Sequence, residues 1–545
     1  MIRKRLIRVF AISCLLVLML LVSNQEEYGS DINCNILQDS FTYKIARNIS
    51  VDLQLDNTHG LRVSDRITKW NIDSAINIIT TECNKEFVSY YPIDEAFLCW
   101  YARKYGQDNL YDIAGFVKQG STECEKWYEI SGKSIHVLWY EFCKENSTYT
   151  YMLDNITCYG NIAGTVNDKD IVIDFVGDIN FDSKWHTMKS AKKNKNGISD
   201  SFSKEIKEEL CSADVTVVNN EFSYAGKAKA QKDKDYVFSA KKDSVKYLDI
   251  LGTDIVSIAN NHVYDYGKAG FINTLDTLSD AGIEVVGGGR NIDEASATKY
   301  FIVNGRKIGI ISATEIEKFS HFTKAATKKD AGVFKMLDSS LLIKKIKAAK
   351  RSCDYLIAYV HWGNEGTEFF EYDQTMYAEQ MADAGVDAII GAHPHRLQGC
   401  SFIKDVPVVY SIGNFWFSTG SLYTSIAQIR IDKKGKLTMR MLPCIQRKLK
   451  TSIITDSKKK DKFYKYLADV SRKVGIDKNG TLYNLDFNQN DTNKADSKGS
   501  KGTKRKNSTE HIKSDMEYKS EKGYSKHNSE YDIDGNRIDR VGNLE

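Results

Sequence analysis

The chain has 545 residues, of which 42% are hydrophobic, so it is long enough for several domains and at least one large apolar core. Its 76 basic residues nearly cancel its 72 acidic residues and leave a formal net charge of +4. This balance excludes a strongly basic protein. The overall charge therefore gives no support for nucleic-acid binding, and we expect no nucleic-acid partner.

The N-terminus has the pattern of a secretory signal that stays attached to the chain. Residues 1–8 are rich in Lys and Arg, and the run Val9–Val22 is apolar apart from Ser13. No small-x-small cleavage site follows, so we predict that residues 1–23 form an uncleaved signal anchor. Because basic flanks stay on the cytoplasmic side, the prediction is a single-pass protein of the cell membrane with extracytoplasmic domains.

Residues 24–165 show helical hydrophobic periodicity and hold many aromatic side chains, for example in Ala96–Tyr101 and Ile135–Phe142. We predict a small, mainly helical domain whose aromatic residues form its core. The alternative is a module that binds a wall or capsule polymer. The cysteines of this region permit disulfides outside the cytoplasm, but their pairing stays open. They are Cys34, Cys83, Cys99, Cys124, Cys143 and Cys158.

Residues 166–450 alternate β-rich apolar runs with amphipathic helical stretches, which is typical of an α/β domain. One helical face is marked by Phe271, Leu275 and Leu278. The predicted strands are 171–176, 214–218, 254–258, 283–286, 308–312, 355–360, 388–390 and 408–411.

The composition changes again after this domain. We predict a helical extension over residues 451–484 and a disordered tail over residues 485–545. In the tail Asn, Lys, Ser, Asp and Gly dominate and aliphatic residues are sparse. Such a segment buries too little apolar surface to offset the entropy that ordering costs.

Potential metal ligands follow the predicted strands at the point where each strand ends. In α/β sheets, sites form outside the carboxyl ends of the strands, so parallel strands bring such residues to one edge. Each cluster alone is better explained by a polar turn, and the prediction depends on their joint occurrence. Carboxylates, imidazoles and an amide suit divalent Mn, Fe or Zn. The residues are Asp178, Glu221, Asn261, His262, His361, His393 and His395.

A series of motifs in residues 170–445 keeps a fixed order along the chain. They are Val176–Ile179, Asn219–Glu221, Ala259–Gly267, His361–Glu365, Gly391–Gly399 and Ser411–Phe417. Together they resemble the CapA family, the poly-γ-glutamate capsule synthesis group, which is similar to the calcineurin-like metallophosphoesterases. The resemblance implies a four-layer α/β/β/α sandwich with two central sheets. It does not extend to the N-terminal region or the tail.

The resemblance also implies how the ligands divide between one or two ions. Asp178 and His395 would bind one ion, and Glu221 would bridge it to a second. The remaining ligands of the second ion would be Asn261, His361 and His393.

The resemblance further implies that His262 is the general acid or a transition-state contact. Asp265 would orient it, since a neighbouring carboxylate fixes the tautomer of a histidine. One residue departs from the phosphoesterase pattern: Asn180 stands where histidine is common. Whether the first ion lacks a ligand, and whether one or two ions bind, stays open.

The hypothesis for function is a metal-dependent hydrolase or transferase that acts on an anionic cell-surface polymer such as poly-γ-glutamate, in its synthesis or processing. The alternative is a non-catalytic binding or assembly component of a capsule synthesis and export complex, with other membrane proteins as partners. Asn180 and the anchor favour this alternative. The lysine-rich stretch 227–246 is interpreted as a solvated surface loop, and the alternative is that it steers a polyanion toward the site.

Overall fold

The structure is a computed structural model. It describes residues 54–56, 60–62, 75, 78–79, 95–118, 124–146, 169–317, 322–486 and 530–544. The predicted signal anchor, residues 1–23, lies outside this set. No helix among the described residues is both long and apolar enough to cross a membrane. The chain divides into two compact units, Met1–Thr122 and Glu123–Glu545.

The first unit contains a pair of helices among its described residues. Helices α5 (Glu95–Tyr105) and α6 (Gln107–Lys118) pack together across Gly106, which has a positive φ of 97°. Phe97 and Trp100 are buried with ring centroids 5.7 Å apart, so aromatic side chains do lie in the interior of this helical pair. Strands β1 (Gln54–Asp56) and β2 (Gly60–Arg62) form an antiparallel hairpin.

The second unit begins with two helices, α7 (Cys124–Ser131) and α8 (Ile135–Glu145). Ser134 caps α8 by accepting the Val137 N–H, and its own backbone N–H donates to the Gly305 carbonyl at 2.8 Å. The Ser134 hydroxyl also donates to Asp354 at 2.6 Å. These helices therefore pack on the α/β domain, although the sequence grouped them with the preceding helical region.

An eight-stranded sheet forms one half of the α/β domain, in the order β18-β17-β16-β3-β4-β5-β6, with β15 pairing beside β3. Strands β3 to β6 are parallel, while β16, β17 and β18 are antiparallel to their neighbours. The strands are β3 (Ile171–Ile179), β4 (Val215–Asn220), β5 (Ile255–Ser257), β6 (Glu284–Val286), β15 (Asn414–Trp416), β16 (Leu422–Ile431), β17 (Leu437–Arg447) and β18 (Lys450–Ile453).

A six-stranded sheet forms the other half, in the order β13-β14-β12-β11-β9-β8. Its inner strands run parallel, and β8 and β13 are antiparallel strands at its two edges. The strands are β8 (Lys299–Val303), β9 (Arg306–Thr314), β11 (Tyr355–His361), β12 (Ala388–Ala392), β13 (Cys400–Ile403) and β14 (Val406–Val409). The short strands β7 (Gly288–Gly289) and β10 (Gly332–Val333) pair with each other.

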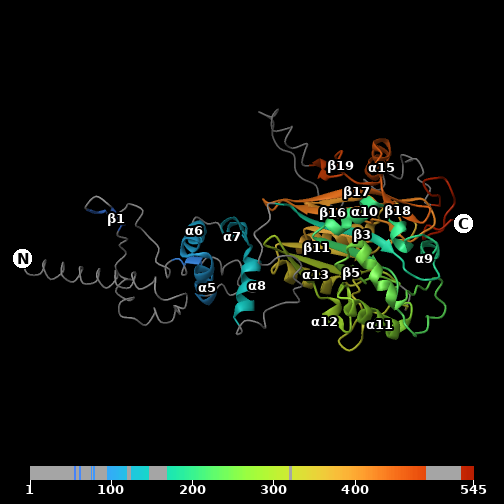
Figure 1. Cartoon of the computed structure of the whole chain (residues 1–545), viewed down its shortest axis with the longest axis horizontal. Helices are drawn as coiled ribbons and strands as arrows, with labels where there is room; N and C mark the ends of the chain where they lie inside the picture. Colours follow the sequence, from blue (N-terminus) through green and yellow to red (C-terminus); the bar gives the residue numbers. More distant parts are fainter. Residues whose placement is uncertain are drawn as a thin grey trace, which may run out of the picture. The chain divides into compact units, whose positions relative to one another are not determined.

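The two sheets pack face to face around a shared core that joins residues such as Phe175 of β3 to Tyr359 of β11. Helices cover the outer face of each sheet and have their own apolar clusters. Figure 1 shows the strands in the middle, with α11 and α12 along their lower border and α15 along the upper. The α/β class predicted from the sequence is confirmed, and its layers follow the order helix, sheet, sheet, helix.

Helices on the eight-stranded sheet are α9 (His186–Ala191), η3 (Gly197–Ser201), α10 (Lys204–Ser212), η4 (Lys242–Leu251) and α11 (Gly267–Asp280). Those on the six-stranded sheet are α12 (Ile292–Ala295), α13 (Ser340–Lys350) and α14 (Tyr372–Ala384). The extension contains α15 (Ser457–Val470) and a hairpin of β19 (Val474–Ile476) and β20 (Leu482–Asn484).

One part of the predicted disordered tail is ordered. Residues 530–544 form tight turns and pack against the α/β domain, where Ile538 and Val541 are buried. The composition of the tail as a whole does not predict this, because two apolar residues in a polar segment give no periodic signal. Their burial depends on a surface that the rest of the domain provides.

A buried carboxyl in β3 should make the stability of the domain depend on pH. Burial raises the pKa of Asp174 from 3.8 to about 8, although Gln428 donates a hydrogen bond to it at 2.9 Å. The folded chain therefore retains a proton that the unfolded chain loses, and stability falls as pH rises from about 4 to 8. Asp174→Asn should therefore make the free energy of unfolding less dependent on pH, by up to about 1.4 kcal/mol per pH unit.

Urea denaturation of the wild type and Asp174→Asn across this pH range measures the difference. The exposed Asp243 supplies a matched control, because Asp243→Asn makes the same chemical change at the surface. Identical pH slopes for the wild type and Asp174→Asn would contradict the prediction.

Candidate metal centre

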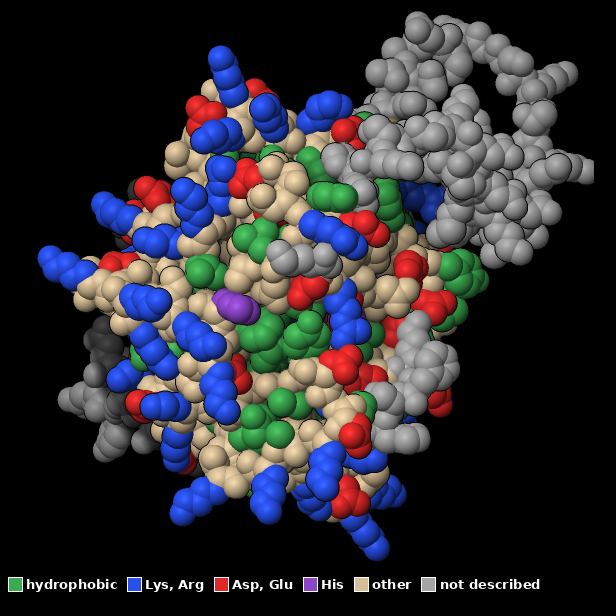
Figure 2. Space-filling view, turned by 90° about the vertical axis from the view of Figure 1, so that its right-hand side faces the viewer, with side chains coloured by type: hydrophobic (Ala, Val, Ile, Leu, Met, Phe, Trp, Pro, Cys, Tyr) green, Lys and Arg blue, Asp and Glu red, His purple; other side chains and the backbone are tan. Residues whose placement is uncertain are grey.

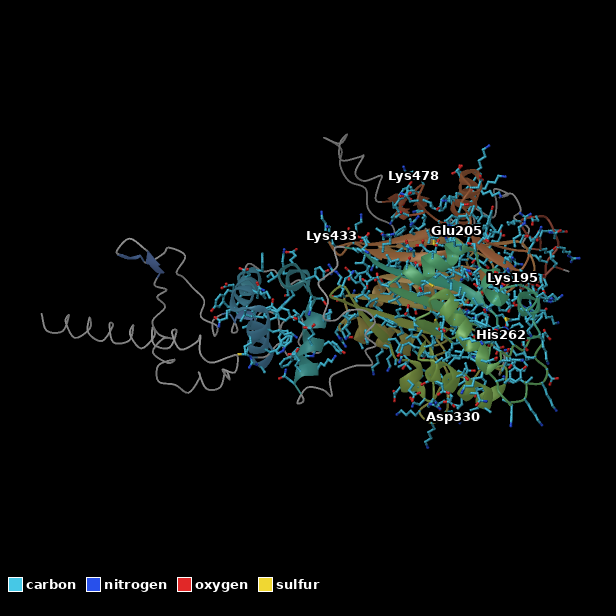
Figure 3. The ribbon with its side chains drawn as sticks, viewed as in Figure 1. Lys195, Glu205, His262, Asp330, Lys433 and Lys478 are labelled. Atoms are coloured by element: carbon cyan, nitrogen blue, oxygen red, sulfur yellow. The ribbon has the colours of Figure 1, made fainter. Side chains whose placement is uncertain are left out.

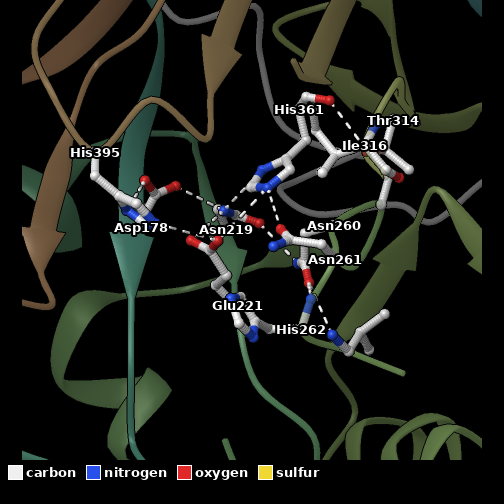
Figure 4. A network of polar contacts seen from close by, with 12 residues as sticks. Asp178, Asn219, Glu221, Asn260, Asn261, His262, Thr314, Ile316, His361 and His395 are labelled. Carbon is white, nitrogen blue, oxygen red and sulfur yellow. Dashed lines mark hydrogen bonds and ion pairs between the residues drawn. The ribbon is translucent and has the colours of Figure 1, made fainter. Parts of the chain in front are cut away.

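The predicted ligands converge where the carboxyl ends of the two sheets meet. Asp178 is the penultimate residue of β3, and Glu221 directly follows β4. His361 is the last residue of β11 in the other sheet. Its Nε2 lies 3.5 Å from Glu221 Oε1, so the two sheets contribute to one site. Figure 4 shows these side chains pointing toward one another.

One group of potential ligands consists of Asp178, Glu221 and His395, which offer one atom each within 4.8 Å of one another. His395 Nδ1 lies 3.1 Å from Asp178 Oδ2, and His395 Nε2 lies 4.0 Å from Glu221 Oε1. All three side chains are buried. The spacing fits donors around a shared cation.

A second group consists of Glu221, His361 and His393, again within 4.8 Å of one another. The imidazole rings of His361 and His393 have centroids 4.7 Å apart. Asn261 joins this group, because its Oδ1 lies 2.9 Å from His361 Nε2. Glu221 therefore belongs to both groups and occupies a bridging position between them.

Several atoms of these side chains are buried and have no hydrogen-bond partner. They include Glu221 Oε1, His393 Nδ1 and His395 Nε2. Buried polar atoms are normally hydrogen-bonded, and exceptions that cluster need an explanation. A divalent cation satisfies all three, since carboxylate oxygen and imidazole nitrogen are its preferred donors. The residues present thus fit one or two metal ions.

The pKa values of these side chains in the metal-free centre reflect their burial close to one another. Burial, with the charge of Asp178 next, raises the pKa of Glu221 well above its usual value. Burial, followed by the neighbouring imidazoles, lowers the pKa of His361 well below its usual value. Burial also lowers the pKa of His393 to about 4. These two histidines are neutral at physiological pH, which is the form that binds metal.

His395 differs from the other histidines of the centre. Burial lowers its pKa, but the hydrogen bond and charge of Asp178 outweigh burial and raise it overall. Its backbone is also unusual, because His393 and His395 have positive φ angles of 102° and 57°. Non-glycine residues adopt such angles only where the surrounding structure holds them. The backbone of the loop after β12 therefore directs the imidazoles of His393 and His395 into the two ligand groups.

Gly391, the penultimate residue of β12, permits close contact between strands. A Cβ at this position would lie 1.9 Å from the Tyr410 carbonyl oxygen and 2.4 Å from Trp362 Nε1. The indole Nε1–H donates to that same carbonyl at 2.8 Å. Only glycine fits there.

Asn219 connects the two groups of potential ligands, although no role was predicted for it. Its Nδ2 donates to Asp178 Oδ1 at 2.7 Å and to Glu221 Oε2 at 3.3 Å, and lies 3.4 Å from His361 Nδ1. Its Oδ1 accepts from Asn260 Nδ2 at 3.0 Å. The residue belongs to the motif Asn219–Glu221, but only the fold shows that one amide reaches three ligands.

His262 lies beside the centre and forms a chain of polar contacts. Its Nδ1 is 2.9 Å from Asp265 Oδ2, and Asp265 Oδ1 forms an ion pair with Lys234 at 2.7 Å. Lys234 Nζ also donates to the Asn261 carbonyl at 2.6 Å. Figure 3 shows His262 within the domain, whereas labelled charges such as Asp330 lie at its border. The structure thus brings His262 and Asp265 together.

Lys234 comes from the lysine-rich stretch that was interpreted as a solvated loop. Its side chain is only 8% exposed and also pairs with Glu317 at 3.1 Å. The interpretation is therefore wrong for this residue, while Lys227, Lys229 and Lys241 do stand near or at the surface. A single buried lysine in a charge-mixed segment has no distinguishing signal in the sequence.

Asn180, the departure from the phosphoesterase pattern, is buried and serves the local turn. Its Oδ1 accepts the Asp182 N–H at 2.8 Å. Asp182 in turn accepts the N–H groups of Lys184 and Ser239. The amide oxygen of Asn180 is thus engaged away from the two ligand groups.

Comparison with known proteins supports the resemblance of the central domain. Residues 172–419 match the family model described as bacterial capsule synthesis protein PGA_cap. The capsule biosynthesis protein CapA of Bacillus anthracis is 29% identical over 251 residues, which cover 45% of this chain and 60% of that protein. The PGA biosynthesis protein CapA of Bacillus subtilis is 31% identical over 217 residues, covering 39% and 56%.

A probable polyglutamine synthesis accessory protein of Mycobacterium tuberculosis is 24% identical over 213 residues, covering 38% of this chain and 56% of that protein. A 5'-nucleotidase structure from Candida albicans aligns at 10% identity with a TM-score of 0.30, covering 51% and 53%. The chain spans little more than half the length of the curated relatives it matches. For this part of the chain the predicted resemblance to CapA proteins is confirmed.

Substitution of single ligands should remove ions selectively. Because Glu221 lies in both groups, Glu221→Gln should abolish binding of every ion at the centre. His393→Ala should affect only the second group, and His395→Ala only the first. Elemental analysis after Mn²⁺ loading and desalting measures the ions per chain.

The exposed His186 provides a control, because His186→Ala removes an imidazole outside the centre. Full metal content in Glu221→Gln would show that the two groups do not share this carboxylate.

Metal binding should tighten as pH rises. Glu221 has a raised pKa in the metal-free protein and must lose its proton before it binds a cation. Affinity should increase about tenfold per pH unit for each proton released. Calorimetric titration with Mn²⁺ in buffers of different ionisation enthalpy counts these protons, and an affinity that is constant from about pH 5 to 8 would contradict the prediction.

Proposed function

From the similarity of the central domain to CapA proteins, we propose that this domain is a metal-dependent hydrolase or transferase acting on an anionic cell-surface polymer. Poly-γ-glutamate is the candidate, since two of the relatives are named for capsule and PGA biosynthesis. The role lies in synthesis or processing of the polymer, and the proposed N-terminal anchor places it outside the cell membrane.

The observation that carries this proposal is the position of Glu221. This buried carboxylate is common to two groups of ligand side chains and has an oxygen with no hydrogen-bond partner. Bound divalent ions supply Lewis acidity and lower the pKa of a bound water. The fold holds the ligand side chains in place for this chemistry, since strands of both sheets end at the centre.

His262 is proposed to supply a proton to the leaving group. Asp265 Oδ2 accepts the Nδ1–H of the ring, which leaves Nε2 to carry the transferred proton. Lys234 neutralises Asp265 from the other side. The Phe238 N–H also donates to Asp265 Oδ2 at 2.7 Å, so the carboxylate is held in place and keeps the imidazole in one orientation.

The substrate class follows from charge and location. Arg540 lies beside Glu365 near the centre, with a guanidinium Nε 3.0 Å from the Glu365 carboxylate and its side chain 53% exposed. Most lysines of the stretch 227–246 are also exposed. Exposed cations favour an anionic substrate, which accords with a polymer of carboxylates.

An assembly role is the second candidate, favoured by one observation. The amide oxygen of Asn180 is bonded to the Asp182 N–H, so this side chain is not arranged as a ligand of the first group. A centre with fewer donors on one side suits a domain that binds the polymer within a capsule synthesis and export complex without cleaving it.

A direct assay separates the two candidates. The Mn²⁺-loaded protein is incubated with poly-γ-glutamate and with a generic phosphodiester, and the products are quantified. His262→Ala should lower kcat by about 10²- to 10⁴-fold, as loss of a general acid does, while bound metal is unchanged. The matched control is His186→Ala, which should keep full activity.

Polymer binding without turnover of either substrate, in protein with its full metal content, would contradict the hydrolase proposal and support the assembly role. If His262→Ala keeps its activity, the hydrolase proposal stands, but the proposed role of His262 as proton donor is wrong.

A further inference from the structure

The C-terminal segment, residues 530–544, reaches the metal centre from a distant part of the sequence. It docks on the loop before β16, where Ser421 N donates to Asp532 at 2.9 Å and Gly420 N donates to the Gly542 carbonyl at 2.9 Å. Figure 2 views the side that carries the C-terminal end, where apolar side chains gather at the centre and Lys and Arg side chains project around them. The segment is thus folded onto this side of the domain.

Asn414 links the segment to the first ligand group. Its Nδ2 donates to the Val541 carbonyl at 2.9 Å, and its Oδ1 lies 2.8 Å from His395 Nδ1. Asn414 is the first residue of β15 and pairs with Asp178 of β3. It is fully buried, so these contacts are shielded from water.

This contact chain acts together with Asp178 Oδ2, which lies 3.1 Å from His395 Nδ1, to place a hydrogen on that nitrogen. A backbone carbonyl accepts hydrogen bonds and never donates, so Val541 fixes the amide nitrogen of Asn414 on its own side. The amide oxygen then faces His395 and accepts the hydrogen of Nδ1. The unprotonated nitrogen is therefore Nε2, the buried atom that has no hydrogen-bond partner in the centre.

Two arginines fasten the segment beside the same loop. Arg396 donates to the His395 carbonyl at 3.1 Å and to the Asp539 carbonyl at 3.1 Å. Arg540 pairs with Glu365, whose neighbour Gly366 donates to the Pro394 carbonyl. The backbone on both sides of His395 is thus tied to the segment or to residues that contact it.

We propose that residues 530–544 act as a positioning element that holds His395, through Asn414, in the orientation that binds a metal ion. The inference rests on the proposed metal centre and extends it to a segment outside the part of the chain that matches the capsule synthesis family. Without the segment, the Asn414 amide loses the contact that orients it, and Asp178 Oδ2, 3.1 Å from His395 Nδ1, is left as the acceptor for the Nδ1 hydrogen.

The first test removes the segment from the otherwise full-length chain, by truncation after residue 529. Loss of such a supporting contact typically lowers metal affinity about 10- to 100-fold. Mn²⁺ titration should therefore show weaker binding at the first group, with binding at the second group, which contains His361 and His393, unchanged. Tyr531→Ala is the matched control, because this side chain of the same segment is 42% exposed.

A second variant keeps the full length and addresses the case in which the truncated chain unfolds. A Cβ on Gly542 would lie 2.6 Å from Leu422 Cδ1, and its φ of +86° is unfavourable for a side chain. Gly542→Val should therefore undock the segment and lower affinity at the first group to the same extent as truncation. Circular dichroism verifies that the domain stays folded.

A combined variant tests whether the effect runs through Asn414. Asn414→Ala alone should weaken the first group about as much as truncation, and the two changes together should be no worse than either alone. Asn414→Asp keeps an oxygen for His395 Nδ1 and should recover part of the affinity lost in Asn414→Ala.

Unchanged Mn²⁺ affinity in both Gly542→Val and the truncated chain, with normal binding by the wild type, would overturn this inference alone. Strictly additive losses in the combined variant would also overturn it. Absence of Mn²⁺ binding by the wild type would instead overturn the proposed function, and the inference with it.

Discussion

The burial of the Glu221 carboxylate is the constraint on which the rest of the site depends. A carboxylate out of contact with water is costly unless it is protonated or paired with positive charge. Here it lies beside Asp178, whose charge raises the pKa of Glu221 further. Among the described residues, no Lys or Arg forms an ion pair with Glu221, whose ion-pair contacts are with His361 and His395. The neutral imidazoles of His361 and His393 do not supply that charge. A divalent cation does.

The supporting network follows from this requirement. Asn219 donates hydrogen bonds to both carboxylates, and it thereby offsets some of the repulsion between Asp178 and Glu221. His262 is kept apart from the ligand groups by its own carboxylate partner, Asp265, which is neutralised by Lys234. The centre therefore holds two kinds of histidine: those in the ligand groups, and His262, which is paired with Asp265 outside those groups. This division accords with the proposed role of His262 as a proton donor.

The site is assembled from both halves of the sandwich and from the end of the chain. The parallel strands of each sheet direct their carboxyl ends to the same place, and the shared core between the sheets fixes their separation. The C-terminal segment is added to this frame and contacts it near His395. A centre built in this way depends on the packing of distant segments, so its ligand geometry and the stability of the domain are linked.

The parallel strands and most of the potential ligands could be predicted from the sequence. Apolar runs such as 355–360 are buried on both faces and therefore read as strands, and polar residues directly after them, such as His361, mark strand ends. Tertiary structure alone decided the antiparallel strands β16 and β17, the burial of Lys234 and the docking of residues 530–544. Local periodicity records which face of an element is apolar. It does not record which distant backbone carbonyl or carboxylate will lie opposite a given side chain, because that depends on how the two sheets pack.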